Sequence, residues 1–164
     1  MSLKIVFITM LAAFALPSFG DQPTKSEGEM NIAKAEQFIE NVLVEPDVAK
    51  SLLLDDFDFV FMGRSQISNV PYDKDTFFSV WLAQVVAPRV PGGFTKFEIV
   101  DAIGDSDGVA LMVEGDAEAI NGRYDNKYAM VFKFEDGKIR SFREYSSDLL
   151  VATRLFKQKL VADE

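Results

Sequence analysis

The residue best placed to do chemistry is a glutamate near the end of the chain. Glu144 lies in the segment GKIRSFREYSSD (137–148), which is typical of a half-buried strand, and it shares strand parity with the apolar Phe142. A carboxylate that faces an apolar interior costs free energy unless it has a partner or a function. The sequence therefore predicts that Glu144 points inward, next to Phe142 and near Tyr128.

A second set of acids alternates along an earlier segment, so its members share one face of a strand. They are Glu114, Asp116 and Glu118. If that face is the outer one, the acids are solvated charges, and the apolar residues between 109 and 113 line the interior. If the strand is bulged, part of the acidic row turns inward.

Two carboxyl groups that meet in an apolar hollow support acid–base chemistry. Desolvation and mutual repulsion would raise the pKa of at least one of Glu144 and Asp116. One could then hold a proton near neutral pH while the other accepts one, which suits proton abstraction beside a carbonyl or activation of a water. Tyr128 or Tyr124 could donate a hydrogen bond to a developing oxyanion. The alternative is that Glu144 forms a structural salt bridge, with Arg123, Arg140 or Arg143 as its partner.

Composition excludes several kinds of site. The chain of 164 residues contains no Cys and no His, which removes disulfides, thiolate nucleophiles, the Ser-His triad and the usual zinc ligands. We expect no metal and no cofactor. Without the first twenty residues, 16 basic residues face 26 acidic ones, a net charge of −10. An acidic surface repels phosphate backbones, so nucleic acid is not an expected partner.

The first twenty residues are typical of a cleaved signal peptide. Lys4 supplies the positive charge, Ile5 to Leu16 is a mostly apolar run of 12 residues, and Ser18-Phe19-Gly20 offers small residues to a signal peptidase. The run is shorter than the roughly 20 residues that span a membrane. The sequence therefore predicts an exported protein, periplasmic or secreted, that has no membrane contact after cleavage.

Helical patterns dominate the first half of the remaining chain. After a flexible lead-in at 21–30, a helix is predicted from Asn31, its expected cap, to about Leu43, with a second short helix from Pro46 through Leu53. Residues 57–62 alternate as a strand. Asp73 is expected to cap a third helix, whose apolar face includes Phe78 and Trp81.

Strand patterns follow, in runs near 94–104, 108–120, 123–135 and 138–147, and hairpin signals such as Asn121-Gly122 separate them. A last helix is predicted over about 148–160. Segregated helices and antiparallel strands indicate one α+β domain over 31–160. We expect a curved antiparallel sheet wrapped around the N-terminal helices, with a cone-shaped hollow of the kind that binds ligands. Ile139 and Phe142 differ in parity although both look like core residues, which hints at a bulge.

The segment NGRYDNKYAMVFKFEDGKIRSFREYSSD (121–148) resembles the terminal hairpin of the nuclear transport factor 2-like superfamily, in its SnoaL-like branch. The similar features are a Gly-Arg-Tyr turn, an aromatic-rich strand, Asp-Gly-Lys-Ile, and Arg-Glu-Tyr with a nearby Asp. The order of elements from Asn31 to about Leu160 agrees as well. The resemblance implies a cone-shaped α+β fold and leaves function open, because this superfamily contains isomerases, cyclases, epoxide hydrolases and non-catalytic binding domains.

The resemblance also implies roles for two acids. In epoxide hydrolases of this superfamily, the acid of the Arg-acid-Tyr motif points into the pocket, which corresponds to Glu144. The strand before that motif supplies an Arg-x-Asp pair in those enzymes. In this chain Asp116 matches the aspartate, and Glu114 stands in the place of the arginine. The first-helix tyrosine of steroid-isomerase-like members and the histidine of SnoaL-like cyclases are both absent.

Two classes of function remain open. The first is an exported binding domain whose apolar pocket holds a small apolar molecule. The second is an acid–base enzyme, an isomerase, cyclase or hydrolase, with Glu144 and Asp116 as catalytic residues. In both cases the chain is expected to form a homodimer through its outer sheet face, where the strand KYAMVFKF would supply apolar area. The expected pocket-lining residues are Phe59, Phe78, Trp81, Tyr128, Phe132 and Phe142.

Overall fold

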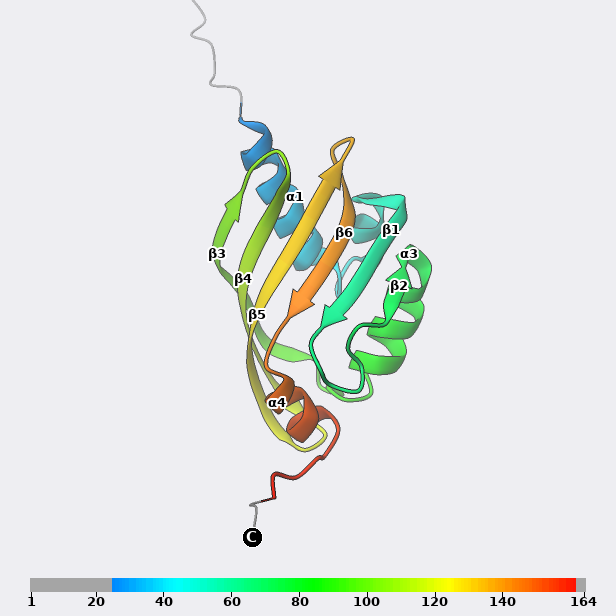
Figure 1. The fold of residues 1–164 in the computed structure, drawn as a ribbon, viewed down its shortest axis with the longest axis vertical. Helices are drawn as coiled ribbons and strands as arrows, with labels where there is room; N and C mark the ends of the chain where they lie inside the picture. Colours follow the sequence, from blue (N-terminus) through cyan, green and yellow to red (C-terminus); the bar gives the residue numbers. More distant parts are fainter. Residues whose placement is uncertain (1–24, 162–164) are drawn as a thin grey trace, which may run out of the picture.

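Six strands form one curved sheet in the order β2-β1-β6-β5-β4-β3 (Figure 1). The computed structural model describes residues 25–161. The strands are β1 (Leu53–Met62), β2 (Pro71–Asp73), β3 (Phe94–Gly104), β4 (Gly108–Ala119), β5 (Gly122–Glu135) and β6 (Lys138–Tyr145). All neighbouring pairs are antiparallel except β1 and β6, which run parallel. The predicted signal peptide lies outside the described residues.

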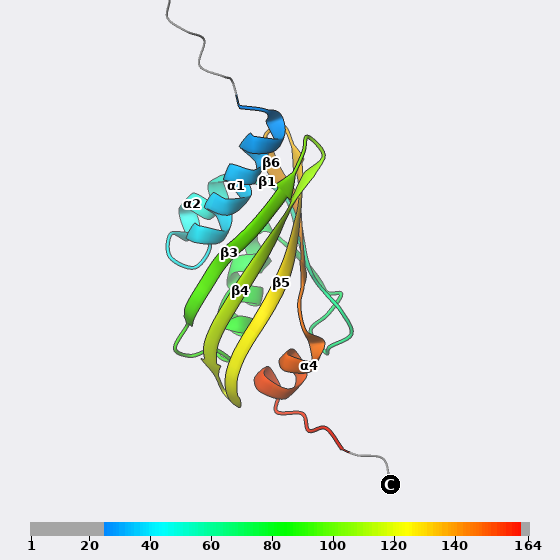
Figure 2. The ribbon, with the colours of Figure 1, turned by 90° about the vertical axis from the view of Figure 1, so that its left-hand side faces the viewer.

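The helices cover the inner face of the sheet (Figure 2). They are α1 (Glu27–Asn41), α2 (Pro46–Ser51), α3 (Lys74–Thr76) and its continuation η1 (Phe77–Val86), and at the C-terminus α4 (Asp148–Leu150) with η2 (Val151–Leu155). The helix η1 is wound wider than an α-helix, as in the hydrogen bond from Ala87 N to Leu82 O at 2.9 Å. Within residues 25–161, no helix has the length and apolar character needed to cross a bilayer. The α+β architecture of a curved sheet around N-terminal helices is confirmed.

Several predicted element boundaries are wrong, and one strand was missed. The second helix ends at Ser51 rather than at Leu53, and the first strand begins at Leu53 rather than at residue 57. The first helix begins at Glu27 rather than at Asn31, because Ser26 and Glu29 form a capping box, so part of the expected lead-in is helical. The C-terminal helix ends at Leu155 instead of near residue 160. The short strand β2 was not predicted, since three residues are too few to show alternation. Asp73 does cap the third helix, and its carboxylate accepts a hydrogen bond from Thr76 N at 2.8 Å.

A bulge in β6 sets which of its side chains face inward. Ile139 pairs with Phe134, and Ser141 pairs with Lys133, so Arg140 is an extra residue in the ladder. The extra residue lets Ile139 and Phe142 both be buried although their parity differs. Beyond the bulge the strand alternates regularly, which places Glu144 on the same inner face as Phe142.

An aromatic cluster fills the space between α1, η1 and the middle of the sheet. Phe142 stacks on Phe132 with ring centroids 4.6 Å apart, and Phe59 lies 4.8 Å from Phe77 and 5.0 Å from Trp81. All five side chains are buried. This packing holds the helices against the inner face of the sheet, where the candidate site lies.

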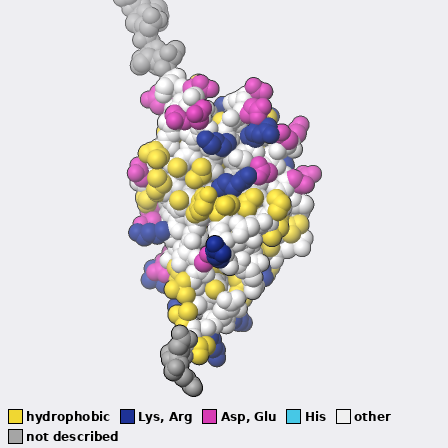
Figure 3. Space-filling model, viewed as in Figure 1, with side chains coloured by type: hydrophobic (Ala, Val, Ile, Leu, Met, Phe, Trp, Pro, Cys, Tyr) yellow, Lys and Arg dark blue, Asp and Glu magenta, His cyan; other side chains and the backbone are white. Residues whose placement is uncertain are grey.

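The outer face of the sheet carries charged pairs and a band of small and aliphatic side chains (Figure 3). Glu114 forms ion pairs with Lys96 and Lys127, at 2.9 and 2.8 Å. The aliphatic residues on this face are Val60, Ala110, Met112, Ala129 and Val131. The aromatic residues of KYAMVFKF are absent from this band: Tyr128 and Phe132 are buried on the inner side, and the half-buried Phe134 packs against the same core. They therefore supply no area for a dimer interface.

Candidate functional site

A largely apolar cavity lies between the helices and the inner face of the sheet. Its volume is about 70 Å³, room for a few water molecules. This is less than the roughly 150 Å³ that holds a benzene ring in an enclosed cavity, so a ring-sized ligand must extend beyond it. The lining comprises Phe38, Ile39, Val42 and Leu43 of α1; Phe77, Trp81, Leu82, Val85 and Val86 of η1; Phe61, Phe94, Phe97, Tyr124, Tyr128, Met130, Phe142 and Glu144 of the sheet; Val151 and Leu155 of η2; and Ile67, Arg89 and Val90 of loops. Such a surface suits an apolar molecule with few polar contacts.

Glu144 is the only acid among the described residues that line this cavity. Its side chain keeps partial exposure because one side faces the cavity, while protein atoms surround the rest. Within residues 25–161 its carboxyl group has no hydrogen-bonding or charged partner, and burial alone raises its pKa to about 8. Glu144 is therefore mostly protonated at neutral pH.

Two tyrosines of β5 lie close to Glu144. Burial, followed by the nearby charges of Tyr124 and Glu144, raises the pKa of Tyr128 far above its usual value. The pKa of Tyr124 is also raised, chiefly by burial. The Tyr124 hydroxyl accepts a hydrogen bond from Asn126 Nδ2 at 2.8 Å. The Tyr128 hydroxyl is a hydrogen-bonding neighbour of Tyr124, and each affects the pKa of the other, but within residues 25–161 it makes no hydrogen bond of good geometry. Both phenols stay protonated and can donate hydrogen bonds.

This arrangement can exchange one proton with a bound molecule. Below pH 8 Glu144 can donate a proton or a hydrogen bond, and above pH 8 it can accept one. Tyr128 can donate a hydrogen bond to an oxygen of the same molecule. Over residues 25–161, no group of three acidic side chains is arranged to hold a metal ion.

The structure brings four of the predicted site residues to the cavity: Trp81, Tyr128, Phe142 and Glu144. Phe59 and Phe132 are fully buried in the aromatic cluster behind the lining. Phe78 packs edge-on against Phe77 on the other side of η1, beneath Lys50. The expectation that these three phenylalanines line the pocket is wrong, because the core packing uses them instead.

Asp116 does not meet Glu144. It lies on the outer face of β4, where Arg123 binds its carboxylate through Nε at 2.9 Å and Nη2 at 2.7 Å and lowers its pKa. β4 pairs with β5 without a register shift, so the acidic row stays on the outer face and Leu111 and Val113 face inward. The hypothesis of a catalytic carboxyl pair is therefore wrong on geometry.

The expected structural partners of Glu144 are also engaged elsewhere. Arg140 forms ion pairs with Asp56 and Glu135, and Arg143 pairs with Asp58. Together with the Arg123–Asp116 pair, these contacts rule out the alternative in which Glu144 is half of a structural salt bridge.

Two residues that shape the site were not predicted. Gly115 faces the interior of β4, and a Cβ atom there would lie 3.0 Å from the ring of Tyr128 and 3.2 Å from that of Phe94. The glycine thus leaves room for both rings beside the cavity. Arg89 lines the cavity from the loop after η1. That loop, between Pro88 and Pro91, has no periodicity from which an inward side chain could be inferred.

No protein-family model and no curated protein sequence matches the chain. Solved structures do match. Bal32a, from a soil-derived mobile gene cassette, aligns with a TM-score of 0.68 at 20% sequence identity, covering 81% of this chain and 100% of its own. An NTF2-like protein from Burkholderia thailandensis E264 aligns with a TM-score of 0.67 at 15% identity, covering 83% of this chain and 100% of its own.

The fold is nuclear transport factor 2-like. An LEH-like epoxide hydrolase from M. tuberculosis shares it, with a TM-score of 0.59 at 20% identity over 80% of this chain and 92% of its own. The resemblance predicted from the terminal hairpin is thereby confirmed at the level of the fold. At such identities the likeness shows the fold alone and carries no activity over to this chain.

Proposed function

We propose that this protein binds a small, largely apolar molecule in the cavity, with a polar group of that molecule against Glu144 and Tyr128. The observation that carries this proposal is the carboxyl group of Glu144, which has no hydrogen-bonding or charged partner within residues 25–161 and faces a largely apolar lining. Buried polar groups in folded proteins nearly always have a hydrogen-bond partner. An occupant of the cavity that supplies one would satisfy Glu144 and could also accept a hydrogen bond from Tyr128.

A pair of matched variants on η1 tests this proposal. Val85 lines the cavity and Ala83 is exposed on the same helix. Val85→Phe should fill the cavity and abolish binding of a single-ring probe such as benzamide, whereas Ala83→Phe should leave it intact. The fluorescence of Trp81, the only tryptophan of the chain, reports binding because its side chain lines the cavity. If benzamide binds the Val85→Phe variant as well as the wild type, or loses binding equally in Ala83→Phe, the cavity is not the binding site.

A second candidate function is acid–base catalysis by Glu144 alone. It is favoured by one observation: the carboxyl group has no cationic partner among the described residues and has a pKa of about 8, close to the range in which a general base works best. Proton abstraction from a bound carbon acid fits this geometry. The base-catalysed ring opening of 5-nitrobenzisoxazole tests it, because this reaction needs only a carboxylate in an apolar site. Equal rates for the wild type and Glu144→Gln would refute the catalytic role.

Export and homodimerisation stay proposals. Export rests on Lys4, the short apolar run and Ser18-Phe19-Gly20. Dimerisation through the outer sheet face now rests on the aliphatic band that includes Met112 and Val131, instead of on the aromatic residues of β5.

A further inference from the structure

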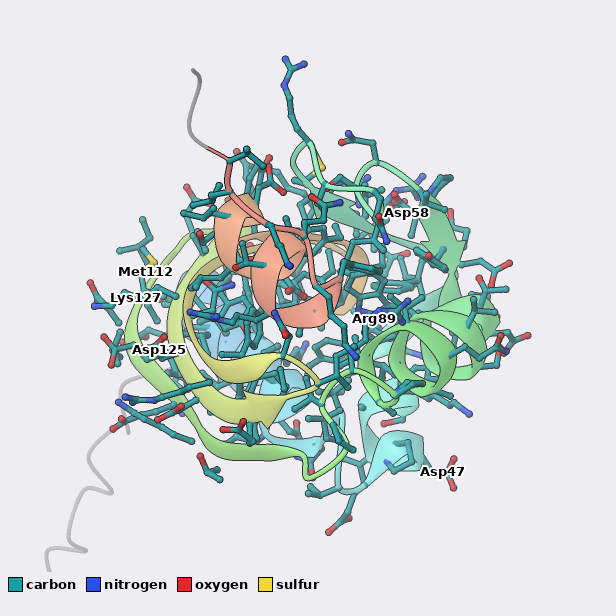
Figure 4. The ribbon with its side chains drawn as sticks, turned by 90° about the horizontal axis from the view of Figure 1, so that it is seen from below. Asp47, Asp58, Arg89, Met112, Asp125 and Lys127 are labelled. Atoms are coloured by element: carbon teal, nitrogen blue, oxygen red, sulfur yellow. The ribbon has the colours of Figure 1, made fainter. Side chains whose placement is uncertain are left out.

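Two charged side chains line the cavity among the described residues, Glu144 and Arg89. Arg89 follows η1 and is half-buried. Figure 4, which looks at the end of the molecule that carries the C-terminal helix, shows Arg89 between this helix and η1. Asp125 and Lys127, by contrast, point away from the outer face of the sheet. Arg89 therefore brings a positive charge to a largely apolar cavity, in a chain of net negative charge.

The contacts of Arg89 leave part of its guanidinium group available. Nη1 donates to Val85 O at 2.6 Å and to Gln84 O at 3.3 Å, and the guanidinium lies over the ring of Phe156 at 4.3 Å. Within residues 25–161 it has no carboxylate partner, and its Nε and Nη2 donate no hydrogen bond. Arginine has five N–H donors in a planar fork that matches a carboxylate. The bonds to η1 and the stacking on Phe156 hold this fork in one place.

We propose that the ligand of the cavity is an amphipathic anion, whose apolar body contacts the aromatic lining and whose carboxylate binds the free edge of the Arg89 guanidinium. This inference rests on the proposed binding function and adds the chemical class of the ligand. Glu144 does not oppose it near neutral pH, because its pKa of about 8 leaves it uncharged there. The charge of Arg89 in a half-buried site attracts an anion more strongly than the same charge in bulk water.

The competing explanation is that Arg89 is purely structural. Its bonds to the last carbonyl groups of η1 and its contact with Phe156 would then be its whole role. A structural arginine and a ligand-binding arginine make different predictions. If Arg89 is structural, its substitution weakens binding of every ligand alike. If Arg89 binds the ligand, its substitution weakens binding of anions alone.

Benzoate and benzamide separate the two explanations, because they share a ring and differ by one negative charge. Their affinities are measured at pH 6.5 by the fluorescence of Trp81 and by ligand-observed NMR. The wild type should prefer benzoate by about fivefold to tenfold, the effect of one charge-assisted contact in a partly exposed site. Arg89→Gln should lose this preference and still bind benzamide. Arg89→Lys should keep only part of it, because the charge remains while the planar fork and its stacking on Phe156 are lost.

The control is Arg123→Gln, which changes the net charge equally on the outer face, where Arg123 pairs with Asp116. It should keep the preference for benzoate. Equal binding of the two probes by the wild type, or a preference that persists in Arg89→Gln, would overturn the anionic ligand while leaving the cavity a binding site. A parallel loss of both probes in Arg89→Gln would show a structural arginine. Failure of both probes to bind the wild type would overturn the binding function itself.

Discussion

Replacing Glu144 with glutamine should stabilise the protein, and the gain should grow with pH. Burial raises the pKa of Glu144 from 4.5 to about 8 in the folded state. One pKa unit corresponds to about 1.4 kcal/mol, so the ionised carboxylate costs the folded state about 5 kcal/mol relative to the protonated acid. Glutamine has a similar shape and never ionises, so this cost disappears in the variant.

The pH window follows from the direction of the pKa shift. Below about pH 4.5 both the folded and the unfolded wild type hold the proton, and the two proteins should differ little. Between pH 4.5 and 8 the unfolded chain ionises while the folded one keeps its proton, so the wild type loses about 1.4 kcal/mol of unfolding free energy per pH unit. The advantage of Glu144→Gln should reach about 3 kcal/mol at pH 7 and level off near 5 kcal/mol above pH 8.

Urea unfolding of both proteins at pH 4.5, 7 and 9 measures this difference directly. The other ionisable groups are the same in both proteins, so their contributions to the free energy of unfolding cancel when the variant is compared with the wild type at each pH. Glu118→Gln, an exposed change on the outer face of β4, is the matched control and should alter the free energy of unfolding by less than about 0.5 kcal/mol. Destabilisation of Glu144→Gln by about 3–5 kcal/mol would mean that the carboxylate has a buried cationic partner, and would refute the reasoning.

Four further predictions concern the base, the core, the assembly and the processing of the chain. The rate of 5-nitrobenzisoxazole ring opening should rise through about pH 8, as Glu144 ionises, and a profile without that rise would exclude this base. Phe59→Ala should cost about 3–5 kcal/mol of unfolding free energy, measured in urea, because the side chain is fully buried among four aromatic rings; a loss below 1 kcal/mol would contradict that packing. Light scattering should give a dimer that Met112→Lys disrupts, and a monomer mass at all concentrations would count against the outer-face interface. N-terminal sequencing of exported material should begin at Asp21, and a start at Met1 would exclude cleavage.

The inward orientation of Glu144 could be predicted because its signal is local. Residues of equal parity share a face of a strand, and Phe142 identifies which face is buried. The mismatch between Ile139 and Phe142 also indicated the bulge that the ladder shows at Arg140. The start of α1 could also have been predicted, because Ser26 and Glu29 have the spacing of a capping box. The apolar periodicity begins only at Ile32, and a boundary based on it starts the helix too late.

The tertiary features of the site could not be predicted in the same way. Alternation shows that Glu114, Asp116 and Glu118 share a face, but the uninterrupted pairing of β4 with β5 decides which face it is. Phe59 and Trp81 look equally suitable as lining in the sequence. In the structure Phe59 is part of the core and Trp81 lines the cavity. This difference depends on how the helices and the sheet pack together, which the sequence pattern does not show.

Some buried polar side chains of this protein have hydrogen-bond partners and others do not. Asn126 is as buried as the core, yet its amide donates to Tyr124 and accepts from Ser147 N at 3.2 Å, as a structural polar residue should. Three buried side-chain atoms have no hydrogen bond of good geometry among the described residues: the hydroxyls of Tyr128 and Ser146, and Nε of Arg154. The two hydroxyls are hydrogen-bonding neighbours of Tyr124 and lower its pKa, so they are weakly bonded rather than isolated. Glu144 differs from them, because its carboxyl group has no partner within residues 25–161 and it faces the largely apolar cavity. A bound molecule with a hydrogen-bonding group would supply the contact that this carboxyl group lacks.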